Sequence, residues 1–256
     1  MGGQVVLVTG ASRGIGLAVT RILLSKFAVD VVAFQRTTSP ELTLLKEAHN
    51  KSLTIVEGDV TSASAIQDAV TTAVSTYGSL SALVLNAGTL HPLARIGSDI
   101  PDLVDKWKSL FDVNFFSLVQ TVHLALPHLR ESQGTVVFVS SGAATGGVAG
   151  WGAYSASKAA MNSLCRTLAS EEPGIVAVAL RPGAVDTGMQ ATIRAIGGAH
   201  MSSKDIAKFT GLHETGTLVK PEDSGHVVAA LAVNAGKDLS GKFVSWDEEA
   251  MAPFRR

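Results

Sequence analysis

The 256 residues carry a formal net charge of −1, and 46% of them are hydrophobic. A nearly neutral chain without a cluster of basic and aromatic residues is not expected to bind nucleic acid. Its one cysteine, Cys165, excludes an intrachain disulfide framework, and its seven histidines show no metal-ligand spacing. Its length suits one α/β domain over residues 1–256. Without a signal peptide or an apolar run of about 20 residues, we expect a cytoplasmic protein that does not cross a membrane.

Short apolar runs alternate with amphipathic segments along the chain. We expect strands at residues 4–10, 29–34, 52–60, 82–88, 135–141, 175–183 and 241–246. We expect helices at 16–27 and 40–50, through Ala73, at 107–129 and 154–170, and from Pro221 onward. The strands are continuously apolar, which indicates a sheet covered on both faces. Their alternation with helices predicts a Rossmann-like, doubly wound parallel sheet of about seven strands.

Residues 187–219 interrupt this alternation. They are rich in Gly, Ser, Thr and His, and they contain two weakly helical patches around Ile193 and Ile206. A segment of this length without a strand is often a binding lid in a compact domain. We therefore predict a substrate lid here, and the alternative is a surface excursion without function.

The sequence TGASRGIG, from Thr9, connects the first expected strand to the first helix. Gly10, Gly14 and Gly16 lack Cβ atoms, so the backbone is able to turn tightly and to approach a pyrophosphate. The N-terminus of the helix then offers free N–H groups and the positive end of its dipole to phosphate oxygens. This position between a strand and a helix predicts a dinucleotide site.

The residues after the second strand favour NADPH over NADH. NAD sites usually place an acid there to bind the ribose hydroxyls. This chain instead has Gln35, Arg36, Thr37 and Thr38. Arg36, helped by Arg13 of the glycine turn, is able to pair with a 2′-phosphate. The alternative is that both arginines are solvated surface residues.

Two further strand ends belong to the same expected site. Asp59 and Val60 end the third strand, where a carboxylate reaches the adenine amino group. Asn86, Ala87 and Gly88 end the fourth strand, where small residues let a cofactor pass over the backbone. Both lie at the edge where open α/β sheets bind ligands.

Tyr154 and Lys158 lie four residues apart on one expected helix, which places them on the same face. A phenol transfers protons poorly at neutral pH, but a nearby cation stabilises phenolate and lowers the phenol pKa. We therefore expect Lys158 to lower the pKa of Tyr154 and to bind the nicotinamide ribose. Tyr154 is then the general acid that protonates a carbonyl oxygen.

Two polar residues are expected beside this pair. Ser141 precedes Tyr154 by 13 residues, so the intervening loop is long enough to bring its hydroxyl next to the phenol. It would polarise and orient the carbonyl. Asn114 lies on a helix expected to pack beside the site, where its amide is able to hold a water connected to Lys158.

These motifs, in this order, resemble the short-chain dehydrogenase/reductase family. The resemblance spans roughly residues 4–246 and rests on TGASRGIG, the NAG motif, YSASK and RPGAVDT from Arg181, together with Asn114 and Ser141. It implies a catalytic tetrad of Asn114, Ser141, Tyr154 and Lys158. It also implies the following cofactor-binding residues: Gly10, Ser12, Arg13, Gly14, Ile15, Gly16, Arg36, Thr37, Asp59, Val60, Asn86, Ala87, Gly88, Tyr154, Lys158, Pro182, Gly183, Val185 and Thr187. The last four of these would border the nicotinamide.

A narrower resemblance is to fungal benzil reductases and sepiapterin reductases. It rests on FDVNFFSLV from Phe111, VFVSSGAA from Val137, the ASEEP run and PGAVDTGMQ. It implies reduction of a small-molecule ketone or vicinal dicarbonyl. Sepiapterin reductases hold their substrate with a C-terminal carboxylate, and Asp247 or Glu248 lies near that position, with a match that slips by one residue. The resemblance also implies a homodimer or homotetramer that pairs through the helices around Asn114 and Tyr154.

The loop after Ser141 supplies small residues and Trp151, and the lid begins near Met189. These residues predict a mainly apolar pocket in which Trp151 either stacks on an aromatic substrate or simply packs. Two other functions stay open. One is an alcohol dehydrogenase that works oxidatively, and the other is a non-catalytic NADP-sensing protein of the same fold.

Overall fold

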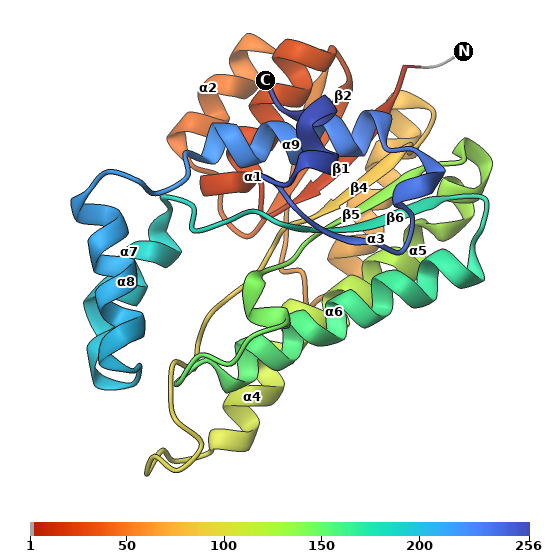
Figure 1. The fold of residues 1–256 in the computed structure, drawn as a ribbon. Coiled ribbons are helices and arrows are strands. Elements are labelled where there is room, and N and C mark those ends of the chain that lie inside the picture. The colour runs from red at the N-terminus through yellow and green to blue at the C-terminus, as the bar shows by residue number, and fades with distance from the viewer. Residues whose placement is uncertain (1–2) are drawn as a thin grey trace.

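The structure is a computed structural model that describes residues 3–256. Seven parallel strands form one sheet in the order β3-β2-β1-β4-β5-β6-β7 (Figure 1). The chain moves outward from β1 to β3, returns to place β4 beside β1, and then moves outward in the other direction. The strands are β1 Val5–Thr9, β2 Asp30–Gln35, β3 Leu53–Glu57, β4 Ala82–Leu85, β5 Thr135–Val139, β6 Val176–Arg181 and β7 Phe243–Ser245. This arrangement confirms the doubly wound parallel sheet expected from the sequence.

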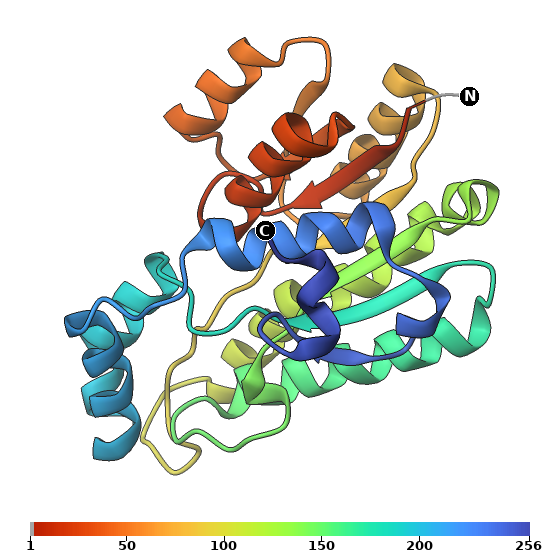
Figure 2. The same ribbon diagram turned by 45° about the horizontal axis from the view of Figure 1, so that its top comes forward.

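Helices cover both faces of the sheet (Figures 1 and 2). One face packs against α1 Gly14–Ile22, α2 Pro40–Ala48 and α9 Pro221–Asn234. The other face packs against α3 Ala63–Tyr77, α5 Ser117–Ser132 and α6 Gly152–Glu171. Within β5, Val137 and Val139 belong to the first core, whereas Val136 and Phe138 belong to the second. Because successive side chains of a strand point to opposite faces, a strand buried on both sides must be apolar throughout.

Local signals explain several helix boundaries. The hydroxyl of Ser39 accepts a hydrogen bond from the backbone N–H of Leu42 at 3.2 Å and caps α2. The Ser62 hydroxyl caps α3 in the same way. Gly78, with a φ of +83°, ends α3 in the left-handed conformation that glycine adopts without strain.

The helix expected at residues 107–129 is longer and less regular than predicted. It begins with α4 Leu103–Phe111, passes through a π-helical turn at Asp112–Phe116, and continues as α5. Among the described residues, Leu103–Ser132 is the one helical stretch long and apolar enough to cross a membrane, and its most apolar 18-residue window has a mean hydropathy of 1.2 and is 39% buried. The expectation that the chain contains no such apolar run is therefore wrong. One face of α5 packs on α3 and the sheet through Leu118, Val122, Ala125 and Leu129.

The segment predicted as a lid contains two helices, α7 Gly188–Ile196 and α8 Ser203–Glu214. They include the patches around Ile193 and Ile206, and they stand apart from the sheet on the left of Figure 1. The two ends of the segment are tied together at its base. The N–H of Asp186 donates to the Val219 carbonyl, and the N–H of Val219 donates to the Ala184 carbonyl, each at 2.9 Å.

Cys165 lies in the second core, where burial raises the pKa of its thiol to about 12. This agrees with a structural role for the cysteine, because the thiolate is the reactive form.

We expect Phe138→Ala to lower the free energy of unfolding by about 3–5 kcal/mol, because it opens a cavity in the fully buried second core. Urea denaturation measures this change. Leu44→Ala is the control: Leu44 is 64% exposed, so its truncation should change the free energy of unfolding by less than about 0.5 kcal/mol. Equal effects of the two substitutions would contradict the packing described here.

Candidate active site

The glycine turn between β1 and α1 is held by close backbone approaches. Gly10 and Gly14 have φ angles of +68° and +55°. A Cβ on Gly16 would lie 2.2 Å from the carbonyl oxygen of Gly10, so no larger residue fits there. Arg13 precedes α1 in extended conformation, and no side chain caps the first turn of the helix. The free backbone N–H groups of this first turn point toward the glycine turn. Because the glycines have no Cβ atoms, the backbone there leaves space that fits a phosphate group.

Asn86 joins the ends of β1 and β4. Its side-chain amide donates to the carbonyls of Thr9 at 3.0 Å and Gly10 at 3.2 Å. The Thr9 hydroxyl in turn accepts from the backbone N–H groups of Asn86 and Ala87. The NAG motif and the glycine turn therefore meet where the strand order reverses, which is the place where such sheets bind ligands.

The loop after β2 is tied to the glycine turn on one side and to β3 on the other. The Ser12 hydroxyl donates to the Thr37 carbonyl, and the Ser39 hydroxyl donates to the Ser12 carbonyl, both at 2.7 Å. The carboxylate of Glu57 accepts from the backbone N–H of Thr38 at 2.9 Å and from its hydroxyl at 2.5 Å. Glu57 was not predicted from the sequence, because a carboxylate at a strand end usually faces solvent.

Arg36 and Asp59 lie at neighbouring strand ends. Hydrogen bonds from Thr61, mainly that from its backbone N–H, hold the pKa of Asp59 below its usual value. The charge of Arg36 also lowers this pKa, so the guanidinium lies within electrostatic reach of the carboxylate. Arg36 itself is exposed. The residues expected to bind the adenosine part of a cofactor thus occupy one edge of the sheet.

Tyr154 and Lys158 lie one turn apart in α6, and both are buried. The Lys158 Nζ atom lies 5.7 Å from the centre of the Tyr154 ring and donates to the Val139 carbonyl at 2.8 Å. Burial lowers the pKa of Lys158 to about 7. Burial raises the pKa of Tyr154, and the hydrogen bond from Ser141 opposes this rise. The expectation that Lys158 lowers the phenol pKa therefore differs from the structure, because desolvation favours the neutral form of both groups.

Ser141 reaches the phenol as its spacing predicts. It follows β5 in extended conformation, and its hydroxyl accepts from the backbone N–H of Ala143 at 3.1 Å. The same hydroxyl lies close enough to the phenol to lower the pKa of Tyr154. The loop from residue 142 to 151 therefore begins next to Ser141 and ends three residues before Tyr154.

Asn114 lies in the π-helical turn between α4 and α5 and is completely buried. Its Oδ1 accepts from the backbone N–H of Thr89, and its Nδ2 donates to the Thr89 carbonyl, both at 2.8 Å. Nδ2 also donates to the Ser157 hydroxyl at 3.2 Å, and that hydroxyl donates to the Tyr154 carbonyl at 2.7 Å. Both amide hydrogens thus have protein partners, so the expected water does not receive a hydrogen bond from this amide. The π-helical turn is a second feature that the sequence did not predict.

Trp151 lies in a nonpolar cluster around Tyr154. Its ring stacks on that of Phe209 from α8, with centres 5.4 Å apart and an angle of 18°. The edge contact with Tyr154 has a centre distance of 5.6 Å and an angle of 88°. Met189 of α7 packs against the same group of residues. The buried members of the nonpolar cluster are Leu90, Leu93, Leu110, Ala143, Trp151, Ala153, Tyr154, Ile193 and Met201.

The segment after β6 brings α7 against the glycine turn. A Cβ on Gly14 would lie 3.0 Å from the Thr187 methyl group. Gly183 has a φ of +84°, and Pro182 and Val185 beside it are buried. All of these residues border the edge that carries the glycine turn and the NAG motif.

Asp247 lies in an exposed turn after β7, where its carboxylate accepts from the Ser245 hydroxyl at 2.6 Å. It is not part of the nonpolar cluster, and the neighbouring Trp246 packs against the first core.

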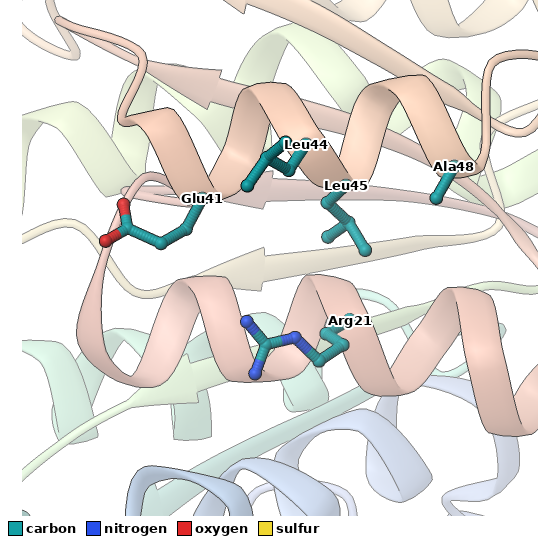
Figure 3. A pocket seen from close by; sticks show the side chains of 5 residues that line it. All are labelled: Arg21, Glu41, Leu44, Leu45 and Ala48. Atoms are coloured by element: carbon teal, nitrogen blue, oxygen red, sulfur yellow. The ribbon is translucent and has the colours of Figure 1, made fainter.

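Two surface hollows lie outside this site. Figure 3 shows one of about 280 Å³ between α1 and α2, with Arg21 and Glu41 at its rim and Leu44, Leu45 and Ala48 along its wall. The other, of about 450 Å³, is lined by residues 91–93 and by Ile100, Lys106 and Ser109. Neither hollow contains Ser141, Tyr154 or Lys158. Residues 3–256 also contain no group of three His, Cys, Asp or Glu residues placed to hold a metal ion.

Comparisons with known proteins agree with this geometry. The family model described as short chain dehydrogenase matches residues 4–196. An uncharacterised oxidoreductase of Schizosaccharomyces pombe is 44% identical over 245 residues, which cover 95% of this chain and 96% of the relative. A benzil reductase ((S)-benzoin forming) of Saccharomyces cerevisiae is 37% identical over 259 residues and 98% of each chain. The crystal structure of a short-chain dehydrogenase/reductase from Saccharomyces cerevisiae matches with a TM-score of 0.94 and 39% identity, over 99% of this chain and 100% of the other.

The buried ammonium predicts an unusual dependence of stability on pH. Burial lowers the pKa of Lys158 to about 7 in the folded protein, from the value of 10.5 that an exposed lysine has. Between these values the unfolded chain binds more protons, so stability rises with pH in this window. Lys158 therefore destabilises the fold fully below pH 7, and this effect disappears as the pH approaches 10.5.

We expect Lys158→Met to raise the free energy of unfolding at pH 7 by on the order of 2–4 kcal/mol and to raise it progressively less toward pH 10. Urea denaturation of the cofactor-free protein at pH 6 to 10 measures the difference. The exposed Lys51 gives the control Lys51→Met, for which the difference from wild type should not depend on pH. A pH-independent effect of Lys158→Met would show that this ammonium is not desolvated.

Proposed function

This chain belongs to the short-chain dehydrogenase family and is an oxidoreductase, and we propose that it uses NADPH to reduce a ketone or vicinal dicarbonyl. The observation that carries the proposal is the burial of Tyr154 beside Lys158, with Ser141 near enough to lower the phenol pKa, at the edge that also bears the glycine turn. The 37% identity to a benzil reductase supports a dicarbonyl substrate.

The residues at the sheet edge fit NADPH. The Gly10–Gly14–Gly16 turn and the uncapped start of α1 suit its pyrophosphate. Gln35, which is neutral, ends β2 where an acid would favour NADH, and the exposed Arg36 follows it. Arg36 and Arg13 would pair with the 2′-phosphate, while Asp59, the NAG motif and residues 182–187 would hold the rest of the molecule. When bound, the nicotinamide supplies hydride to the carbonyl carbon.

Tyr154 acts as the proton donor in this proposal. Its raised pKa keeps the hydroxyl protonated at neutral pH, which is the form that reduction needs and oxidation does not. The Ser141 hydroxyl orients the carbonyl oxygen toward the phenol and stabilises the phenolate after proton transfer. Lys158, with its pKa of about 7, is able to take up and release a proton beside the phenol near neutral pH. The neutral Gln35 and the exposed Arg36 after β2, which favour NADPH, support a reductase over an oxidative alcohol dehydrogenase.

Asn114 acts as a positioning residue. Its amide binds Ser157, which is hydrogen-bonded to the carbonyl of Tyr154, and so it fixes the first turn of α6. A Cβ on Gly88 would lie 3.4 Å from the Asn114 Oδ1 and 3.9 Å from the Lys158 Nζ, so the two side chains flank the same glycine.

The lid segment, residues 187–219, would control access to the site. Tyr154 is only 6% exposed, and α8 covers it through the stack of Phe209 on Trp151. A substrate therefore reaches the phenol when α7 and α8 move. The hydrogen bonds that join residues 184–186 to Val219 form the hinge of this movement.

We further propose a cytoplasmic homodimer or homotetramer. Phe116 and Val119 are 55% and 40% exposed at the start of α5, which suits the pairing of helices that the family resemblance implies.

Tyr154→Phe tests the proton donor. We expect kcat for NADPH-dependent ketone reduction to fall by about 100- to 10,000-fold, because the phenol proton is lost, while NADPH binding stays within about twofold of wild type. Steady-state kinetics and a fluorescence titration with NADPH measure the two effects. Tyr77→Phe is a matched control, since Tyr77 bonds Thr54 away from the site. Wild-type turnover by Tyr154→Phe would show that Tyr154 is not the proton donor. NADPH binding by the wild-type protein without turnover of any carbonyl substrate would instead favour a non-catalytic NADP-sensing protein.

Arg36→Ala tests the cofactor. We expect the KM for NADPH to rise about 10- to 100-fold and the KM for NADH to change little, because the substitution removes the partner of the 2′-phosphate. Arg21→Ala, at an exposed arginine between α1 and α2, should change neither value. A wild-type preference for NADH in kcat/KM would overturn the choice of NADPH.

A further inference from the structure

The indole nitrogen of Trp151 is buried without a hydrogen-bond partner. Trp151 is 6% exposed, and within residues 3–256 its Nε1 is among the few buried side-chain polar atoms that bond to nothing. An unpaired buried donor destabilises the protein, so such groups commonly serve a ligand. The indole can donate one hydrogen bond and accept none, and its missing partner is therefore an acceptor.

The surroundings of Trp151 restrict where that acceptor comes from. The nonpolar cluster around it is built from aliphatic and aromatic side chains. The Phe209 ring already occupies one face of the indole, which leaves less room for the stacking on an aromatic substrate expected from the sequence. The N–H is therefore the part of Trp151 still available for recognition, and it lies in the same buried cluster as the Tyr154 hydroxyl.

The rings of Trp151 and Tyr154 are in edge contact, with centres 5.6 Å apart. The nonpolar cluster thus offers two donors on adjacent rings, a phenol O–H and an indole N–H. A simple ketone has one acceptor oxygen and leaves one of these donors unpaired. A vicinal dicarbonyl has two acceptor oxygens on neighbouring carbons, so it is able to pair with both.

We propose that Trp151 determines specificity for vicinal dicarbonyls: its N–H binds the non-reacting carbonyl oxygen while Tyr154 protonates the reacting one. This inference rests on the proposed function. One carbonyl carbon gains a hydride, for which NADPH is the reductant and NADP⁺ the by-product. Its oxygen gains the Tyr154 proton, which solvent returns to the phenolate. The second carbonyl is only bound, so the product is an α-hydroxy ketone. A substrate without the second oxygen lacks this contact and reacts less efficiently.

Trp151→Phe removes the N–H and keeps an aromatic ring that stacks on Phe209. Benzil and deoxybenzoin form a matched pair of substrates, because deoxybenzoin has one carbonyl in place of two. We expect wild type to prefer benzil, and Trp151→Phe to lower kcat/KM for benzil about tenfold while changing that for deoxybenzoin less than about twofold. Phe209→Leu keeps the N–H and removes the stack, and it should affect both substrates alike.

Equal losses for the two substrates, or no loss for benzil, would show that Trp151 only packs and would overturn the inference. Trp151→His, which retains a ring N–H, should recover part of the benzil preference, and thermal unfolding of each variant confirms that it is folded. If wild type reduces neither ketone, the proposed function fails. Calorimetric titration of benzil and deoxybenzoin into the NADP⁺ complexes then tests Trp151 alone: benzil binding must weaken selectively in Trp151→Phe, and any other result overturns the inference.

Discussion

The side-chain amide of Asn114 holds the catalytic part of the site together. It satisfies both backbone groups of Thr89 in the loop after β4, and it donates to Ser157 in α6. An aspartate would have no hydrogen for the Thr89 carbonyl, and a leucine would leave both Thr89 groups unpaired in a buried place. The positions of Tyr154 and Lys158 relative to the sheet edge therefore depend on one amide that occupies a π-helical turn.

Burial has two opposite effects on the chemistry of this site. It excludes water from Tyr154 and Lys158, and it shifts both groups toward their neutral forms. The charged forms of Tyr154 and Lys158 are therefore unfavourable in the site without ligands. Additional polar groups beside them are needed to stabilise the pair. Ser141 is one such group already in place. A substrate oxygen and the polar part of a cofactor would add to it, which links proton transfer to the presence of both.

The fold was largely predictable because each strand carries its own signal. β5 is apolar at every position after Thr135 because both of its faces are buried, and the glycine turn has closely spaced glycines where side chains would clash with the backbone. The π-helical turn at Asp112–Phe116 was not predictable, because one extra residue in a helix hardly changes its apolar pattern. Phe209 was missed because α8 has no buried residue of its own and is weakly patterned.

The direction of the pKa shift of Tyr154 could not be predicted from residue spacing alone. Two residues four positions apart must lie near each other on a helix, so the contact with Lys158 was predictable. The sign of the pKa shift depends on how many atoms cover the pair, and these atoms come from α8 and from the loop after β5. Glu57 illustrates the same difficulty, since its hydrogen bonds to Thr38 depend on the register between β2 and β3.

Because Cys165 is buried and unreactive, the motion of α7 and α8 is measurable with labels attached to introduced cysteines. Its thiol is fully buried, with a pKa of about 12, so it reacts slowly with maleimides or spin-label reagents while the protein is folded. A cysteine introduced at the exposed Lys204 in α8, paired with one at the exposed Lys51, would therefore carry labels at two chosen places without removal of the native thiol. The distance between such labels reports the opening of the active site in a chain that otherwise keeps its natural core.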